Sequence, residues 1–190
     1  MEKRWSGCYS DEELEKLGIK FGKNVVISKD TKIYHPEELT IGDNVRIDDY
    51  AILTGEIQLG NYVHIGGFSL LSGKHKIKMG NFTSTAARVS IYTANDDYSN
   101  GTSLTNPTIP DNFHKTIVGK VVLEDHVLIG ANTVVLPSAY LEEGVTVGAH
   151  SLVKGSRYSR WHLYTGVPAK KIKQRPSEII LRDAKKLMNP

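Results

Sequence analysis

The sequence predicts an all-β solenoid, in which short parallel strands coil around a narrow apolar core. Three observations support this fold class. Aliphatic residues recur at every sixth position, the slot four residues after each is mostly small or apolar, and glycine often follows directly. A period of six fits neither an α-helix, at about 3.6 residues per turn, nor a heptad repeat. The aliphatic positions form two series: Ile41, Ile47, Leu53, Leu59, Ile65, Leu71 and Ile77, then Leu123, Ile129, Val135, Leu141, Val147 and Val153.

Three such hexapeptides make one triangular coil of about 18 residues, and successive coils stack about 4.8 Å apart. Each aliphatic side chain points inward, where only branched side chains and small neighbours fit. The glycines that follow are expected at the corners, where the backbone needs positive φ. They are Gly42, Gly60, Gly66, Gly130 and Gly148. Parallel strands alone would favour a right-handed winding.

Length and composition limit the classes of protein. A chain of 190 residues suits one domain. With 24 Lys and Arg against 21 Asp and Glu, the formal charge is +3, which argues against a nucleic-acid-binding surface. Cys8 is the only cysteine, so no internal disulfide can form. No apolar run approaches the roughly 20 residues of a transmembrane segment, and no signal peptide is apparent, so a cytoplasmic location is expected.

Residues 1–20 are predicted to cap the open end of the solenoid. Ser10 and Glu13 form a possible capping box for a short helix, Asp11 to Leu17, which Gly18 closes. An apolar face of this segment would cover the unpaired strand edges. Its expected members are Trp5, Tyr9 and Leu14.

The repeat extends over residues 21–175 and is interrupted once. It slips by two residues between Leu39 and Ile41, and again between Ile77 and Met79. Residues 94–120 then show no period at all. Long segments without secondary structure are uncommon in compact domains and are often functional. Because the repeat resumes cleanly afterwards, we expect a loop that projects from one coil.

Residues 176–190 predict a C-terminal helix, since Ile179, Ile180, Ala184 and Leu187 share one helical face. The segment before it contains no acidic residue between Glu143 and Glu178. Its seven basic residues could receive phosphate groups. They are Lys154, Arg157, Arg160, Lys170, Lys171, Lys173 and Arg175.

The repeats, the single long loop and the ending Tyr164-Thr-Gly-Val-Pro-Ala-Lys-Lys-Ile172 resemble the hexapeptide-repeat acyltransferases. The galactoside and maltose acetyltransferases and the O-acetyltransferases of bacterial surface polysaccharides are the nearest groups. The resemblance implies a left-handed β-helix, a homotrimer, and active sites between neighbouring subunits. It also implies acetyl-CoA as acyl donor and a small-molecule sugar as acceptor, acetylated on a hydroxyl group.

The resemblance also assigns cofactor contacts. In this family the pantetheine arm of coenzyme A bonds to backbone groups at the corners, and the matching positions are Ala131 and Ala149. Lys170, the basic residue after Gly-Val-Pro, would approach the adenosine phosphates together with Lys171. Lys154 falls at a further contact position but carries a different side chain from the family.

The catalytic histidine of the family, placed where the loop leaves the solenoid, has no counterpart here. The segment contains Asn95, Asp96, Asp97 and Tyr98 instead. Adding one coil and the two-residue slip to His75 leads to Asn95. The first hypothesis is therefore that His75 is the general base, with Asp96 or Asp97 orienting its imidazole.

Two alternatives for the base stay open: His114 in the loop, or no histidine at all. Asn95, Tyr98 and His114 are the residues expected to bind the acceptor. An amino group needs less help from a base than a hydroxyl group. N-acetylation of an amino sugar, possibly nucleotide-linked, is therefore the second functional hypothesis.

A third hypothesis is a non-catalytic or metal-dependent β-helix protein. The carbonic anhydrases that share this fold have a histidine pair five residues apart, which this chain lacks, and it has no Cys/His cluster of zinc type. No metal site is expected. A scaffold protein would need neither the loop nor the basic segment.

Overall fold

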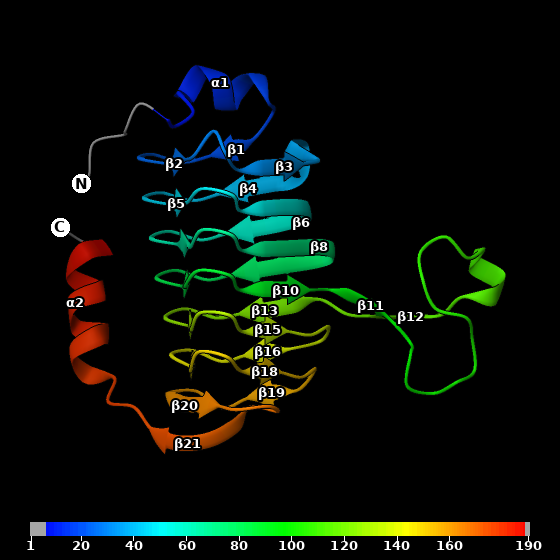
Figure 1. Ribbon diagram of the computed structural model, residues 1–190. Helices are drawn as coiled ribbons and strands as arrows, with labels where there is room; N and C mark the ends of the chain where they lie inside the picture. The colour runs from blue at the N-terminus through cyan, green and yellow to red at the C-terminus, as the bar shows by residue number, and fades with distance from the viewer. Residues whose placement is uncertain (1–6, 189–190) are drawn as a thin grey trace.

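The computed structural model describes residues 7–188, and its strands coil into a triangular solenoid of about seven turns (Figure 1). The winding is that of a left-handed parallel β-helix. The handedness implied by the family resemblance is therefore confirmed, and the general preference for right-handed crossovers does not hold here. The helix α1 lies at one end of the solenoid, and β21 closes the other (Figure 1).

Two sheets form the three faces. The eight-stranded sheet covers one face. It contains β2 (Val26–Ile27), β5 (Arg46–Ile47), β7 (His64–Ile65), β9 (Ser84–Thr85), β14 (Leu128–Ile129), β17 (Thr146–Val147), β20 (His162–Thr165) and β21 (Lys170–Gln174). Every pairing in it is parallel except that of β20 with β21.

The eleven-stranded sheet covers the other two faces, because its long strands β6 and β8 run over both. It contains β1 (Lys20–Phe21), β3 (Lys32–Tyr34), β4 (Leu39–Ile41), β6 (Ile52–Leu59), β8 (Leu70–Met79), β10 (Ser90–Tyr92), β13 (Val121–Leu123), β15 (Val134–Val135), β16 (Tyr140–Leu141), β18 (Leu152–Val153) and β19 (Arg157–Tyr158). A short 3-10 helix, η1 (Pro36–Glu38), precedes β4.

The core is made of the aliphatic residues that the period of six selects. Every residue of both series is buried, and Leu59, the most accessible of them, is only 4% exposed. Registers such as Leu53 with Leu71 place one series member on top of another. The interior is thus a continuous apolar column, which supports the stability of all the coils together.

The expected role of the glycines is wrong. None of the five has positive φ, and the left-handed corners are mostly occupied by Asn, His and aromatic residues. These glycines are instead required by close packing between coils. A Cβ atom on Gly66 would lie 2.6 Å from the backbone carbon of Ala86, and one on Gly130 would lie 2.5 Å from the nitrogen of Ala149.

The second two-residue slip is a bulge in β8. Gly73 pairs with Gly55 and Ile77 with Ile57, so the three residues between 73 and 77 stand opposite Glu56 alone. Ile77 and Met79, which follow the bulge, are both buried. The extra residues are accommodated at the corner, which leaves the core undisturbed.

A helix covers the end of the solenoid at which the sequence predicts a cap. The helix α1 (Asp11–Lys16) begins with a full capping box between Ser10 and Glu13. Leu14 is completely buried, and Tyr9 packs against the core. Trp5 lies outside the described residues. No helix among residues 7–188 is long and apolar enough to cross a membrane.

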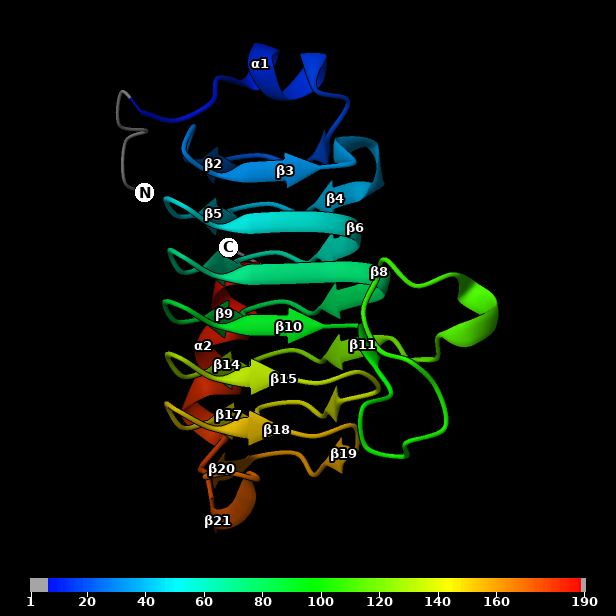
Figure 2. The same cartoon turned by 45° about the vertical axis from the view of Figure 1, so that its right-hand side comes forward.

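The second helix, α2 (Glu178–Met188), runs back along the solenoid (Figures 1 and 2). Ile180, Ala184 and Leu187 line a hollow against Phe82, Ser84, His126 and Leu128. Beneath it four rings lie along one edge of the solenoid: Tyr62, Phe82, His126 and, beyond the coil that carries Gly144, Trp161. The centroids of Phe82 and His126 are 5.0 Å apart, with the ring planes nearly parallel.

We expect this stack to make the protein less stable in acid. Burial lowers the pKa of His126, against the opposing effect of Asp125 and Glu143. The unfolded chain therefore binds a proton more readily than the folded one, and stability falls as the pH drops through about 6.5. His126→Phe should reduce the loss between pH 7.5 and 5.5, by at most about 1 kcal/mol, in urea unfolding. The control is His35→Asn, at an exposed histidine outside the stack, which should not reduce the loss of stability between pH 7.5 and 5.5.

Candidate functional site

The predicted loop leaves the solenoid through an antiparallel hairpin. The strands β11 (Ala94–Asp96) and β12 (Thr116–Val118) pair with each other, and the 3-10 helix η2 (Asp111–Phe113) lies near its outer part. The N–H of Gly119 donates to the carbonyl of Thr93 at 3.0 Å, which closes the base of the loop. The whole segment projects from one side of the solenoid (Figures 1 and 2).

A His–Asp pair lies within this loop. Nε2 of His114 is 2.8 Å from Oδ1 of Asp96. The His114 side chain is 13% exposed and that of Asp96 is 34% exposed, so the pair is partly shielded but reachable. Nδ1 of His114 has no hydrogen-bond partner among residues 7–188. This nitrogen is therefore available to exchange a proton with a bound substrate.

Asp97 has a structural role in the loop. Its carboxylate oxygens accept hydrogen bonds from Nδ2 of Asn100 at 2.7 and 2.8 Å. Its own N–H donates to the carbonyl of Lys115 at 3.0 Å, and the residue is buried. These contacts hold the two sides of the loop together. They leave Asp96 as the carboxylate that faces a histidine.

The predicted hydrogen bond from His75 to Asp96 or Asp97 does not occur within the described residues. Asp96 pairs with His114, Asp97 pairs with Asn100, and the His75 imidazole forms no hydrogen bond with either within residues 7–188. His75 lies exposed in the bulge of β8, and its N–H donates to Oγ1 of Thr93 at 3.0 Å. The parallel pairing of this coil ends at Tyr92 with Ser72, and Asn95 pairs with Ile117 in the hairpin instead.

A groove at the base of the loop brings together three of the predicted residues. Asn95, Tyr98 and Lys154 line a hollow of about 300 Å³. Leu136, Pro137 and Ser138 form its floor from the next coil. Lys154 was assigned to the cofactor and the other two to the acceptor. A site that holds both substrates side by side needs this kind of juxtaposition.

The loop exposes apolar side chains and has no core of its own. Tyr98 is 75% exposed, Phe113 59% and Leu104 58%. Such a cluster on a projecting segment is typical of a surface that is covered by another chain or a ligand. The monomer alone provides no cover for it.

The predicted cofactor positions lie at one corner. Ala131 and Ala149 occupy equivalent places on adjacent coils, where the carbonyl of Ala131 accepts from the N–H of His150 at 2.8 Å. The N–H groups of both alanines have no hydrogen-bond partner within the described chain. Free backbone donors at small residues suit an extended ligand with carbonyl groups.

The predicted phosphate-binding lysines lie on an exposed strand. Lys170 and Lys171 belong to β21, which pairs with β20 at the end of the solenoid opposite α1. Neither lysine has a carboxylate partner among residues 7–188. Their charges are therefore available for an anion.

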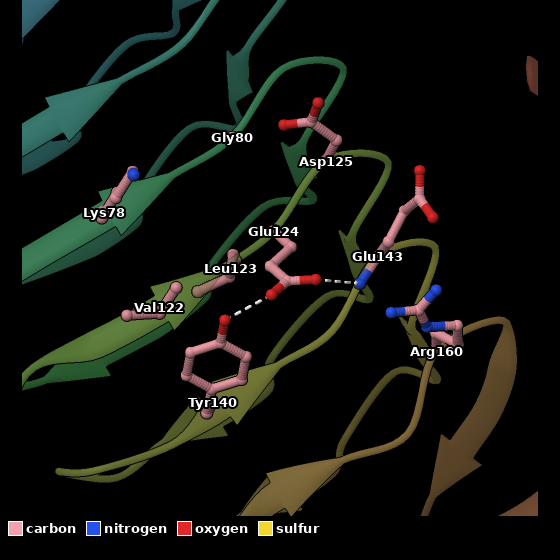
Figure 3. A pocket seen from close by; sticks show the side chains of 9 residues that line it. All are labelled: Lys78, Gly80, Val122, Leu123, Glu124, Asp125, Tyr140, Glu143 and Arg160. Carbon is pink, nitrogen blue, oxygen red and sulfur yellow. Dashed lines mark hydrogen bonds between the residues drawn. The ribbon is translucent and has the colours of Figure 1, made fainter.

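A separate hollow of about 360 Å³ lies on the eleven-stranded sheet (Figure 3). Its carboxylates serve the fold. Glu124 accepts hydrogen bonds from the Tyr140 hydroxyl and from the N–H of Glu143, and Asp125 accepts from the N–H of Asn81. The bond to Glu124 raises the pKa of Tyr140. The hollow contains none of the predicted site residues, and no cluster of metal-ligating side chains occurs within residues 7–188.

The known proteins that this chain resembles are sugar acyltransferases. The bacterial transferase hexapeptide model (six repeats) matches residues 39–73 and 120–155. A dTDP-4-amino-4,6-dideoxy-D-glucose acyltransferase of Escherichia coli is 36% identical over 178 residues, which cover 91% of this chain and 92% of that protein. A putative lipopolysaccharide biosynthesis O-acetyl transferase of the K12 strain is 30% identical over 153 residues, 78% of this chain and 74% of that protein.

Among solved structures, AntD, an N-acyltransferase from Bacillus cereus in complex with dTDP and 3-hydroxybutyryl-CoA, has a TM-score of 0.91 at 43% identity. The match covers 98% of this chain and 100% of AntD. A variant of AntD has been solved with dTDP-4-amino-4,6-dideoxyglucose and coenzyme A. The chain therefore belongs to the hexapeptide-repeat acyltransferase family, and it is an enzyme of the acyltransferase class.

The pairing of His114 with Asp96 is the feature that sequence reasoning missed. It depends on the register of β11 and β12, in which Asp96 stands opposite Thr116. Thr116, Ile117 and Val118 have high β-propensity, which was the available signal for a returning strand. The absence of a six-residue period concealed it.

Proposed function

We propose that this enzyme transfers an acyl group from acyl-CoA to the amino group of a nucleotide-linked amino sugar. The observation that carries the proposal is the end-to-end similarity to two acyltransferases whose names specify a dTDP-linked amino sugar or N-acylation. The names of these relatives supply both the nucleotide and the amino group of the proposed acceptor.

In this reaction the amine nitrogen attacks the thioester carbonyl, an N–C bond forms and the C–S bond breaks. The nitrogen loses one proton, and the coenzyme A thiolate gains one, so the reaction needs no oxidant or metal. Nδ1 of His114 would accept the proton, while Asp96 stabilises the imidazolium and fixes its tautomer. A backbone N–H near Ala131 would stabilise the oxyanion.

O-acylation of a sugar hydroxyl is the second candidate. The relative named as an O-acetyl transferase favours it, and a His–Asp pair is equally suited to deprotonating a hydroxyl group. The first candidate is preferred because the N-acyltransferase relatives cover a larger share of both chains.

The direct test offers the purified enzyme acetyl-CoA with one of three acceptors: dTDP-4-amino-4,6-dideoxyglucose, dTDP-glucose, or a free amino sugar. Thiol release and mass spectrometry report the reaction. Rapid acylation of the first alone supports the proposal, whereas acylation of dTDP-glucose at a similar rate would favour a hydroxyl acceptor. Acyl-CoA and nucleotide-linked sugars are both made in the cytoplasm, which fits the expected location.

We also propose that the active enzyme is a homotrimer with sites between neighbouring subunits. The exposed apolar residues of the loop supply a reason, since a second chain would cover Leu104 and Phe113. Sedimentation at micromolar concentration tests this directly, and a monomer would contradict it.

The basic strand leads to a prediction about the donor. Replacing Lys170 and Lys171 with alanine should raise KM for acetyl-CoA about tenfold and leave kcat nearly unchanged, because two charge-assisted contacts are lost. A donor without the 3′-phosphate should be affected less. Lys185 and Lys186 on α2, replaced together, are the control. Equal losses with both donors would mean that the two strand lysines serve the fold.

A further inference from the structure

One corner of the solenoid carries an exposed aromatic stack. Tyr50 and Phe68 lie on adjacent coils, with ring centroids 4.9 Å apart and planes inclined by 30°. Arg88 follows on the next coil, and its guanidinium lies 5.4 Å from the centre of the Phe68 ring. The three side chains form a column, which we call the platform.

The platform is accessible, in contrast to the other stack. Tyr50 is 52% exposed and Phe68 56% exposed, whereas the stack that contains Phe82 and His126 lies beneath α2. Tyr50 and Phe68 both adopt the left-handed conformation, at φ 61° and 59°. Asparagine, which tolerates this conformation better, occupies the same kind of corner at Asn132. The backbone geometry does not require aromatic residues at these two corners, and half of each side chain stays exposed to solvent.

The positive charge of Arg88 is not paired with an acidic side chain within residues 7–188. The contact described for its guanidinium is the ring of Phe68. The carboxylate of Asp48, two coils before Arg88, is already paired with Nε of Arg46 at 2.6 Å and Nε2 of His64 at 2.8 Å. These bonds outweigh the effect of burial and lower the pKa of Asp48. An exposed guanidinium beside aromatic faces therefore remains.

The platform and the candidate cofactor positions share this corner. The N–H of Arg88 donates to Gly67, that of Asn132 to Ala87, and that of His150 to Ala131. These bonds join consecutive coils, so Phe68 lies two coils from Ala131, about 10 Å along the axis. A ligand on the platform would thus extend toward the acyl group of a donor bound at Ala131.

We propose that the platform binds the nucleoside diphosphate of the acceptor, with the base stacked on Phe68 and Tyr50 and the pyrophosphate at Arg88. Every nucleic-acid base has a flat face that can stack on an aromatic side chain. A guanidinium forms paired hydrogen bonds to phosphate oxygens. The inference depends on the proposed function for the presence of a nucleotide. It adds the residues that recognise that nucleotide.

The experiment measures binding of dTDP alone to the full-length protein by calorimetry, without turnover. Phe68→Leu removes the π face and keeps the apolar bulk, and it should weaken dTDP binding about 5- to 100-fold. Arg88→Gln should weaken it about tenfold, while Arg88→Lys, which keeps the charge, should restore part of the loss. Tyr34→Leu is the matched control, since Tyr34 is 57% exposed on another face.

Each outcome separates the platform from the proposed function. Unchanged dTDP affinity in both variants, with wild-type binding intact, would overturn the platform alone. If the wild-type protein does not bind dTDP and acylates free sugars, the platform and the proposed function are both overturned. Binding of coenzyme A should stay within twofold of wild type in every variant. If the variants instead dissociate in sedimentation experiments, the column is a subunit contact and the proposal fails.

Discussion

His114→Gln should lower kcat for acyl transfer by about 10²–10⁴-fold, because a glutamine cannot accept the proton that leaves the acceptor. The amide occupies a similar volume and can still donate a hydrogen bond to Asp96, so the loop should keep its structure. Asp96→Asn should lower kcat less, since the imidazole stays in place without its charged partner. Single-turnover kinetics with saturating acetyl-CoA and acceptor would measure the chemical step directly.

His75→Gln is the matched control for this experiment. His75 is exposed on the bulge and lies outside the His–Asp pair, so its variant should retain most of the wild-type activity. The reverse result, an inactive His75 variant and an active His114 variant, would restore the first hypothesis for the base. If neither change slows the chemical step, the reaction proceeds without a histidine, as attack by a neutral amine would allow.

Mixed trimers should recover activity from two inactive variants. His114→Gln removes the proposed base in the loop. Ala149→Trp places a large side chain at the cofactor corner and should reduce kcat/KM for acetyl-CoA by about 100-fold, because the donor is displaced. The two variants are unfolded together and refolded into mixed trimers. In these trimers, a site between subunits needs an intact loop from one chain and an intact corner from its neighbour. One site in four satisfies this, so about a quarter of wild-type activity should return.

The same mixture distinguishes the arrangement of the site. If the loop and the corner of one chain formed the site, every chain would carry a defect and no activity would return. Ala149→Ser, a small change at the same position, should behave like wild type and shows that the corner tolerates substitution. Sedimentation of the refolded mixture confirms that trimers formed.

The fold was predictable because the period of six reflects a physical requirement that recurs at every coil. Each inward position, from Ile41 to Val153, must fit the same narrow interior, so the sequence repeats the same class of side chain. The caps were predictable for local reasons, since the Ser10–Glu13 box satisfies the free N–H groups of α1 within one turn.

The site was less predictable because it depends on where the periodic pattern fails. The bulge that contains His75 and the departure of the chain after Thr93 both change the register, which the repeat count cannot detect. The contact between His114 and Asp96 spans 18 residues of a loop without a period. The positions of Ala131 and Ala149 were easier to predict, because both belong to the regular coils and lie at one corner of the solenoid.

The loop is inserted between coils that already fit each other. Met79 pairs with Leu123 and Ile91 with Val135, so the strands before and after the loop continue one ladder. A cut in the backbone near Gly101 would therefore leave two fragments, each ending in a complete half of the apolar column. Such fragments have matching edges and should reassociate when expressed separately. The enzyme can thus be regarded as two stacked modules, whose junction is the place where new acceptor-binding segments could be introduced without disturbing either one.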